Sequence, residues 1–504
     1  MSEHGAREYV PFVPALNVRS RIAAWCSVGL GFCSFLFLQG NQDVITSFGF
    51  SLCLTILGIV CFRWWTSPVH PGLFNYFSPH AIILLHFFIY FGPGNLLPLA
   101  FPEQIVITYG SQDYYLPTLM IAILGAVVFD FCYRFLCRWL KLNRSLEECV
   151  AGFYSPRIQA SIAPTALVWF VVCTAIFLYM SRTYLMMTFR FVGVAQTIDT
   201  TYSTAGPALL GVAWGLGSLL LWRQQAKIGR VLVTGMLVSL LPIYLAYQNR
   251  RLFLYSMVST LMAYLFVRVG RFTPRKLIGA FALMAAAFVL ISMAKVTVTR
   301  ADYSLGRYTQ EEKDIFSRAQ RIVSSPDFLK LQPLEGLLQH NARERMAGLD
   351  WPAAIMGAHL SRNIPFMEGE VNLASAAMAV PRLLWPNKPS VGIGTLVYTH
   401  YGLAAIDPLG TPLSAAYADW GVLGILFGFS FLTLLFVLGL KAITLRRDGI
   451  VIYVGALSML MRFEDTLVRY PIRWLRWVAI LMVANAVIRY IFEVYAYRKD
   501  KSGD

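Results

Sequence analysis

The chain has 504 residues, of which 57% are hydrophobic and 14% are charged, whereas ordinary soluble domains carry about 25% charged residues. This composition excludes a soluble globular protein and predicts an all-α protein that crosses a membrane many times. The formal net charge of +16 requires no nucleic-acid partner, because basic loops beside anionic membrane lipid account for much of it.

Apolar runs recur along the chain and predict a polytopic membrane protein. Most have roughly 16–22 residues, enough to cross a hydrocarbon layer about 30 Å thick as helices. The third run contains Phe-Gly-Pro-Gly at 91–94, which predicts a kink or a broken end. We count about twelve transmembrane helices, at 22–39, 47–62, 80–99, 116–136, 162–181, 206–222, 230–247, 252–268, 276–295, 415–440, 449–462 and 475–494.

The positions of Lys and Arg predict the orientation in the membrane. With twelve spans, the N-terminus, the C-terminal tail and most of the basic connections fall on one side. The connections 40–46 and 100–115, on the other side, contain no Lys or Arg. Because basic loops stay in the cytoplasm, we expect both termini to be cytoplasmic.

The segment 297–414 combines polarity and length as no other part of the chain does. It holds His340, His359 and His400, three of the seven histidines, and it balances 11 Lys and Arg against 11 Asp and Glu. Loops of this length are usually functional. We therefore predict helices one to nine over 1–296, a large extracytoplasmic helical loop over 297–414, between helices nine and ten, and helices ten to twelve with a cytoplasmic tail over 415–504.

The local sequence of this loop predicts several elements. Residues 338–361 indicate a helix in two pieces, broken before Pro352. Residues 366–370 form a turn that leads into a helix of small residues at about 371–380. Thr411 and Pro412 are suited to the cap and the first position of helix ten.

Three segments here carry a resemblance to a known family. They are Phe-Met-Glu-Gly-Glu at 366–370, Pro-Arg-Leu-Leu-Trp-Pro-Asn-Lys-Pro at 381–389 and Thr-Pro-Leu-Ser-Ala-Ala-Tyr-Ala-Asp-Trp-Gly at 411–421. Together with Asn249-Arg250-Arg251 between two helices, and with the region of Arg462, they resemble the oligosaccharide repeat-unit polymerases (Wzy-type) of bacterial surface polysaccharides. The layout of the twelve spans and the outer loop is similar in that family and in the O-antigen ligases.

The resemblance implies glycosyl transfer at the outer face of the bacterial inner membrane. The donor would be an oligosaccharide on undecaprenyl pyrophosphate, and the acceptor the non-reducing sugar of a second lipid-linked unit. A membrane partner that regulates chain length is expected from the resemblance alone. No cofactor or metal is expected, because arginines can stabilise the pyrophosphate as it leaves.

Outward-facing arginines are the candidates for pyrophosphate binding. Guanidinium donates two parallel hydrogen bonds to phosphate oxygens and stays charged when partly buried. Alternatively, each of them extends to outer-leaflet headgroups or pairs with a nearby carboxylate. The candidates are Arg250, Arg251, Arg345, Arg382, Arg462 and Arg469.

A general base must take the proton from the acceptor hydroxyl. His359 is the first choice, because the ligases that the chain resembles use an outer-loop histidine near arginines, and Glu370 and Glu368 follow. Alternatively, the histidine packs between helices and the glutamates pair with nearby arginines. Trp385 and Tyr398 are suited to stacking on sugar rings, and a loop core explains them equally well.

Two other functions stay open at this stage. An O-antigen-ligase-like transferase would use the same donor but move the glycan to another acceptor. A transporter or flippase of lipid-linked sugars would form no glycosidic bond, and such proteins tend to show repeat symmetry with paired broken helices, which the sequence lacks.

Overall fold

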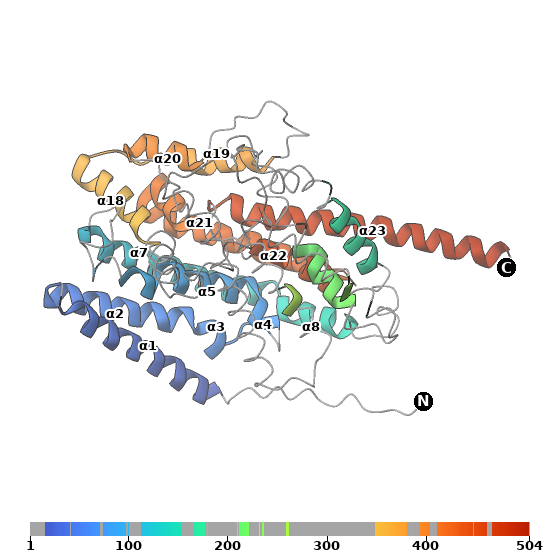
Figure 1. Cartoon of the computed structure of the whole chain (residues 1–504), viewed down its shortest axis with the longest axis horizontal. Helices are drawn as coiled ribbons and strands as arrows, with labels where there is room; N and C mark the ends of the chain where they lie inside the picture. The colour runs from blue at the N-terminus through green and yellow to red at the C-terminus, as the bar shows by residue number, and fades with distance from the viewer. Residues whose placement is uncertain are drawn as a thin grey trace, which may run out of the picture.

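A computed structural model of the chain (Figure 1) describes residues 16–40, 42–70, 74–96, 99, 112–153, 165–176, 179, 209, 211–220, 231, 234–235, 259–261, 348–380, 385, 393–403, 411–446, 448–460 and 466–502. Every regular element within these ranges is helical. The prediction of an all-α protein is therefore confirmed for the described part of the chain.

The N-terminal half contributes α1 (Leu16–Leu38), α2 (Val44–Cys61), the short α3 (Arg63–Thr66) and α4 (Phe74–Phe77), α5 (Pro79–Phe91), α7 (Tyr115–Trp139) and α8 (Leu142–Phe153). The C-terminal part contributes α18 (Asp350–Arg362), α19 (Glu370–Ala379), α20 (Ile393–Tyr401), α21 (Pro412–Thr444), α22 (Gly449–Leu460) and α23 (Arg469–Ser502). Shorter apolar helices cover Thr165–Ile176 and Gly211–Leu220.

Five of the described helical segments are long and apolar enough to cross a membrane. They are Val18–Leu38, Val44–Thr66, Tyr115–Trp139, Pro412–Thr444 and Arg469–Ile491. Each coincides with one of the apolar runs of the sequence. The total of about twelve spans and the full extent of the outer loop stay predictions, because most of 230–247 and all of 276–295 and 297–347 lie outside the described residues.

The predicted break in the third apolar run is confirmed. Helix α5 ends at Phe91, with Gly92 as its C-cap, and Pro93–Asn95 continues as a short 3-10 helix. At the break the Gly92 carbonyl accepts from the Asn95 N–H over 3.2 Å, and the Tyr90 carbonyl lies in the last turn of α5, where carbonyls lack helical partners. The Asn95 side chain donates to both, over 2.9 Å and 3.1 Å.

The start of α18 is anchored on this break. The Gly348 N–H donates to the Tyr90 carbonyl over 3.1 Å, and the Leu349 N–H donates to the Asn95 side-chain oxygen over 3.0 Å. A Cβ at Gly348 would lie 2.4 Å from that same carbonyl oxygen, so only glycine fits. The broken end of α5 thereby fixes the first described helix of the segment 297–414.

We expect Asn95→Leu to destabilise the protein by about 1–3 kcal/mol, because it leaves the Leu349 N–H without its acceptor and takes one donor from each of the Tyr90 and Gly92 carbonyls. Asn95 is 1% exposed and serves three backbone groups. The measurement is the midpoint of thermal unfolding in detergent. The matched control is Gln42→Leu, which removes a partly exposed side chain that donates to the Leu99 carbonyl. An equal effect in both variants would contradict the anchoring role of Asn95.

Helix α18 begins two residues earlier than the predicted break before Pro352. Its first residue is Asp350, so the proline lies inside the first turn. Proline is tolerated there because the first N–H groups of a helix have no helical partner. The short helix of small residues predicted at 371–380 is confirmed as α19, and Thr411 and Pro412 cap and open α21 as predicted.

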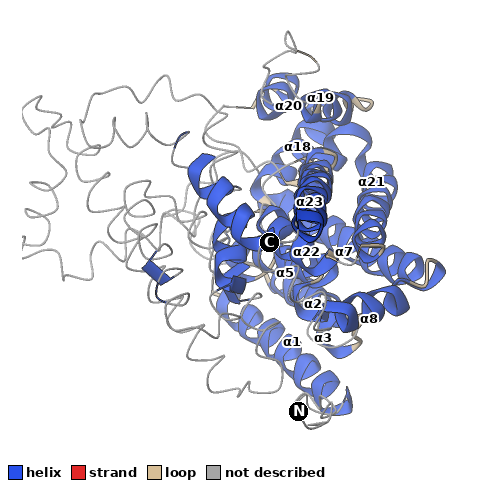
Figure 2. Ribbon diagram, turned by 90° about the vertical axis from the view of Figure 1, so that its right-hand side faces the viewer, coloured by secondary structure: helices blue, strands red, loops and turns tan. Residues whose placement is uncertain are grey.

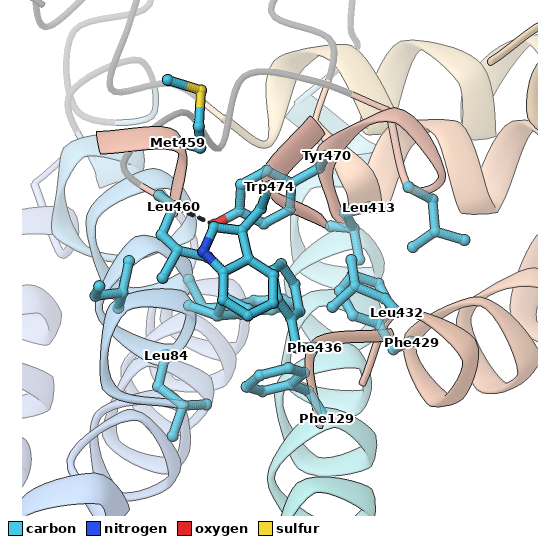
Figure 3. Close-up of a cluster of buried hydrophobic side chains, with 14 of the residues drawn as sticks. Leu84, Phe129, Leu413, Phe429, Leu432, Phe436, Met459, Leu460, Tyr470 and Trp474 are labelled. Atoms are coloured by element: carbon cyan, nitrogen blue, oxygen red, sulfur yellow. Dashed lines mark hydrogen bonds between the residues drawn. The ribbon is translucent and has the colours of Figure 1, made fainter. Parts of the chain in front are cut away.

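The core lies between α5, α7, α21, α22 and α23. Figure 3 shows Phe129 of α7 and Phe436 of α21 packed with Tyr470 and Trp474 of α23, and the Tyr470 O–H donates to the Leu460 carbonyl over 2.6 Å. A Cβ at Gly439 of α21 would lie 2.3 Å from the Trp474 ring, so this glycine permits the close approach of α21 and α23. The last spans are thus packed firmly against the first ones.

Candidate functional site

Helices α18, α19 and α20 lie together beside the first part of α21 (Figures 1 and 2). All three contact one another or α21, and α19 also contacts α23. These helices carry His359, Glu370 and His400, and the turn before α19 carries Glu368. Three residues predicted for the site, His359, Glu368 and Glu370, therefore lie on neighbouring elements of the fold.

Helix α21 is broken close to its start. Trp420 and Gly421 have non-helical backbone angles, and Gly421 has a φ of +59°. The break lets the carbonyls of residues 418 and 419 turn toward the turn 366–370. Ala418 accepts from the Met367 N–H and Asp419 accepts from the Glu368 N–H, each over 3.0 Å.

The Asp419 carboxylate caps α19 from outside that helix. Its two oxygens accept from the N–H groups of Val371 and Asn372, each over 2.9 Å. The N-cap residue Gly369 has no side chain that could do this. Asp419 is fully buried, and hydrogen bonds to a charged group contribute about 1.5–3 kcal/mol each. Both oxygens of this carboxylate are thus engaged in structure.

Two glycines allow the turn and the helix break to approach. A Cβ at Gly369, which has a φ of +98°, would lie 2.7 Å from the Trp420 ring, and a Cβ at Gly421 would lie 2.7 Å from the Phe366 ring. The segments 366–372 and 417–421 therefore form one unit, which we call the turn–break cluster. These are parts of two of the sequence segments on which the family resemblance rests.

His359 lies on the edge of this cluster. Its ring stacks on Phe366, with ring centroids 3.9 Å apart and an interplanar angle of 25°, and Phe366 meets Tyr417 edge-on. The Nδ1–H of His359 donates to the Ile364 carbonyl over 2.8 Å. Since a carbonyl oxygen only accepts, the hydrogen of the neutral ring is on Nδ1 and the lone pair is on Nε2. No hydrogen bond to Nε2 occurs within the described residues.

His400 holds the neighbouring carbonyl. Its Nε2–H donates to the Pro365 carbonyl over 2.8 Å. Histidines from α18 and α20 therefore donate to the successive carbonyls of Ile364 and Pro365. The next residue, Tyr401, donates its O–H to the Ala418 carbonyl over 2.9 Å. Burial, and then the charge of Asp419, raise the pKa of Tyr401, which keeps this donor protonated.

Glu368 and Glu370 are both exposed. Neither forms an ion pair with another described residue. Glu368 has a φ of +50°, in the left-handed region, which costs a residue other than glycine about 1–2 kcal/mol. The exposed carboxylate is therefore carried by a backbone conformation that is unfavourable for glutamate.

The other predicted residues are placed only in part. Arg469 is the first residue of α23, Trp385 is 41% exposed, and Tyr398 meets Trp351 edge-on with ring centroids 6.5 Å apart. The remaining predicted residues lie outside the described ranges: Arg250, Arg251, Arg345, Arg382 and Arg462.

The structure also contains a buried polar cluster that the sequence reasoning missed. Asp130 of α7 is 1% exposed and binds His80 of α5 over 2.8 Å, Arg134 over 2.7 Å and Arg63 over 3.0 Å. A signal was present, because an acid inside an apolar run implies a buried partner. The cluster ties α3, α5 and α7 together.

Next to it, His70 completes a second set of hydrogen bonds. Its ring binds Asn143 over 3.0 Å and Tyr133 over 2.8 Å. Burial lowers the pKa of His70 to about 3, so the ring stays neutral at physiological pH. The Asn143 oxygen then accepts from Nδ1–H and the Tyr133 O–H donates to Nε2, which satisfies both ring nitrogens.

A third buried group joins the C-terminal helices. Asp448, directly before α22, accepts from the Asn485 amide of α23 over 2.8 Å, and Asn485 in turn accepts from the Trp169 indole N–H. Arg446 and Arg489 lie 3.4 Å and 3.6 Å from the same carboxylate. These contacts connect the start of α22 with α23 and with the helix Thr165–Ile176.

Comparisons with known proteins assign no family to the chain. No family model, no curated protein and no solved structure matches the chain.

Proposed function

We propose that the chain is a membrane glycosyltransferase that polymerises undecaprenyl-pyrophosphate-linked oligosaccharide units at the outer face of the bacterial inner membrane. The observation that carries this proposal is the turn–break cluster. Two sequence segments that resemble the repeat-unit polymerases, more than 40 positions apart along the chain, meet there. Beside them lies a histidine whose hydrogen-bonded Nδ1 leaves a lone pair on Nε2.

In this proposal, His359 Nε2 takes the proton of an acceptor hydroxyl. The oxygen then attacks the anomeric carbon of the donor, and the bond from that carbon to the pyrophosphate oxygen breaks, with inversion. Undecaprenyl pyrophosphate leaves with the bonding electrons. Glu370, exposed at the start of α19, is the second candidate for the base.

Arginines are proposed to hold the pyrophosphate. Arg469, Arg473 and Arg476 follow one another at i, i+4 and i+7 on α23, so they share one face of that helix. Helix α23 contacts α19, which begins beside the acidic turn. Arg250, Arg251, Arg345, Arg382 and Arg462 complete the proposed set.

A purified, reconstituted protein with extracted undecaprenyl-pyrophosphate-linked repeat units tests the proposal. We expect a ladder of longer glycans on gels and in mass spectra, formed equally well in EDTA, because arginines supply the positive charge. Transfer to another lipid acceptor without a ladder would indicate a ligase. Turnover that EDTA abolishes and Mg²⁺ restores would contradict the arginine mechanism.

The Asp130 cluster favours transport as the second candidate, because ionisable groups inside membrane helices often mark transport pathways. A protein that moves lipid-linked sugars across proteoliposomes and makes no new glycosidic bond would establish this alternative. Asp130→Asn separates the two: it would abolish transport, whereas for a polymerase it would only lower stability.

A further inference from the structure

Glu368 has a left-handed backbone conformation that a glutamate rarely adopts. Among the described residues other than glycine, Lys141, Asn363 and Glu368 have a positive φ. Asn363 is the C-cap of α18, and Lys141 follows Leu140, the C-cap of α7; left-handed residues are ordinary at such helix ends. Glu368 instead precedes the helix α19. With Gly369, at a φ of +98°, it forms the inner pair of a tight turn that the Glu370 N–H closes on the Met367 carbonyl over 3.0 Å. Asparagine, aspartate and glycine are the usual residues in such a turn, and glutamate is not.

The surroundings impose this conformation. The Met367 N–H donates to the Ala418 carbonyl, and the Glu368 N–H donates to the Asp419 carbonyl. Beyond it, the N–H groups of Val371 and Asn372 are held by the Asp419 carboxylate. Asp419 is therefore a positioning residue for the turn. Strained residues of this kind persist only where neighbours over-determine them, and they cluster at functional sites.

Glycine would suit this position better than glutamate, since it adopts a positive φ without steric cost. The presence of a glutamate is explained if its carboxylate binds something outside the chain. The carboxylate is exposed and forms no ion pair with another described residue. Its chemistry therefore points to a ligand that donates hydrogen bonds.

The neighbouring surface indicates which ligand. The Trp420 indole packs over Gly369, the residue next to Glu368, yet it is 44% exposed. The non-helical angles at Trp420 and Gly421 hold this ring in the break of α21. A sugar fits both groups. Its neighbouring hydroxyls can donate to the carboxylate, and the C–H face of its ring can stack on the indole.

We propose that Glu368 and Trp420 form a sugar-binding subsite, which Asp419 positions, and that the subsite takes the non-reducing sugar of the acceptor. This inference rests on the proposed function for the role of the sugar as acceptor. The binding of a sugar is a separate claim, which is tested without turnover.

The first test measures strain against function. Glu368→Gly is expected to raise the unfolding temperature by about 1–2 °C and to raise the KM for the acceptor by about 10- to 100-fold, the range for a lost charge-assisted hydrogen bond. The matched control is Lys141→Gly, at the same φ of +50°, which is expected to stabilise the protein without changing the KM. Glu368→Asp, which keeps a carboxylate and tolerates the left-handed region, is expected to recover part of the affinity.

The second test measures binding directly. The probe is the repeat-unit oligosaccharide released from its lipid by mild acid, and millimolar amounts are expected to raise the unfolding temperature of the wild type. Glu368→Gln and Trp420→Ala are expected to lose most of this rise, and Lys141→Gly to keep it. If the wild type binds the sugar but makes no polymer, the result contradicts the polymerase function and supports the sugar-binding subsite. An unchanged rise in Glu368→Gln, or a lower unfolding temperature in Glu368→Gly, would overturn the subsite.

Discussion

Replacement of His359 by asparagine is expected to lower the polymerisation rate by about 100- to 10,000-fold, the usual contribution of a general base. The amide nitrogen of asparagine takes the place of Nδ1, so it can still donate to the Ile364 carbonyl, which His359 binds over 2.8 Å. It has no atom in the place of Nε2. The substitution therefore removes the proposed base and keeps the anchor of the loop.

The matched control is His400→Gln. His400 donates through Nε2 to the Pro365 carbonyl, and the amide nitrogen of glutamine takes the place of that atom. We expect this variant to fold and to polymerise normally, because it keeps the grip on the loop. The measurement is the initial rate of polymer formation by reconstituted protein, at equal amounts of folded enzyme.

The outcomes separate three roles. Loss in His359→Asn with normal activity in His400→Gln supports His359 as the base. Equal loss in both variants means that the loop geometry matters and the lone pair does not. Normal activity in His359→Asn together with loss in Glu370→Gln transfers the role of the base to Glu370.

The sequence predicted helices well where the pattern is local. Length and hydropathy were enough to locate α1, α2, α7 and α21, because a bilayer requires long apolar helices whose backbone groups pair within the helix. Caps were equally readable: Thr411 accepts from the Ser414 N–H and Pro412 opens the helix, as the residue types indicate. Phe-Gly-Pro-Gly at 91–94 was recognisable as a break for the same reason.

The partners of that break were not predictable. Nothing in the sequence indicates that Asn95 meets Leu349, because contacts between distant segments depend on how the helices pack. The same holds for Asp419, whose partners no sequence pattern indicates. The structure assigns its two oxygens to the N–H groups of α19, a role that no local motif encodes.

The residues of the candidate site were proposed from the sequence alone, and the structure adds the surroundings of three of them. His359, Glu368 and Glu370 were named from the outer loop, but their surroundings were not. The left-handed φ of Glu368 and the stacking of His359 on Phe366 depend on the break at Trp420 and Gly421. A break near the start of an apolar run has only a weak local signal, here the Trp-Gly pair.

Asp419→Ala is expected to have the second large effect, on stability and activity together. The substitution removes the fully buried carboxylate that accepts from the N–H groups of Val371 and Asn372. Both N–H groups then lack an acceptor, which should lower the free energy of unfolding by about 2–4 kcal/mol. Because the turn 366–370 loses its anchor, polymer formation should fall by at least about 10-fold even at temperatures where the protein stays folded. Asp419→Asn keeps one acceptor oxygen and turns a donor toward the other N–H, so it should lie close to the alanine variant.

The matched control for Asp419 is another helix-capping carboxylate, on a helix outside the turn–break cluster. Asp43 caps α2 by accepting from the Thr46 N–H over 2.8 Å at an exposed position, and Asp43→Ala should cost about 1 kcal/mol with no loss of polymer. Thermal unfolding and protease cleavage within residues 363–372 measure the two effects separately. If Asp419→Ala unfolds at the wild-type temperature and the turn resists protease, the carboxylate does not hold the turn. If the turn is cleaved while polymer formation stays normal, the turn–break cluster is structural, and the active site must be sought elsewhere in the outer loop.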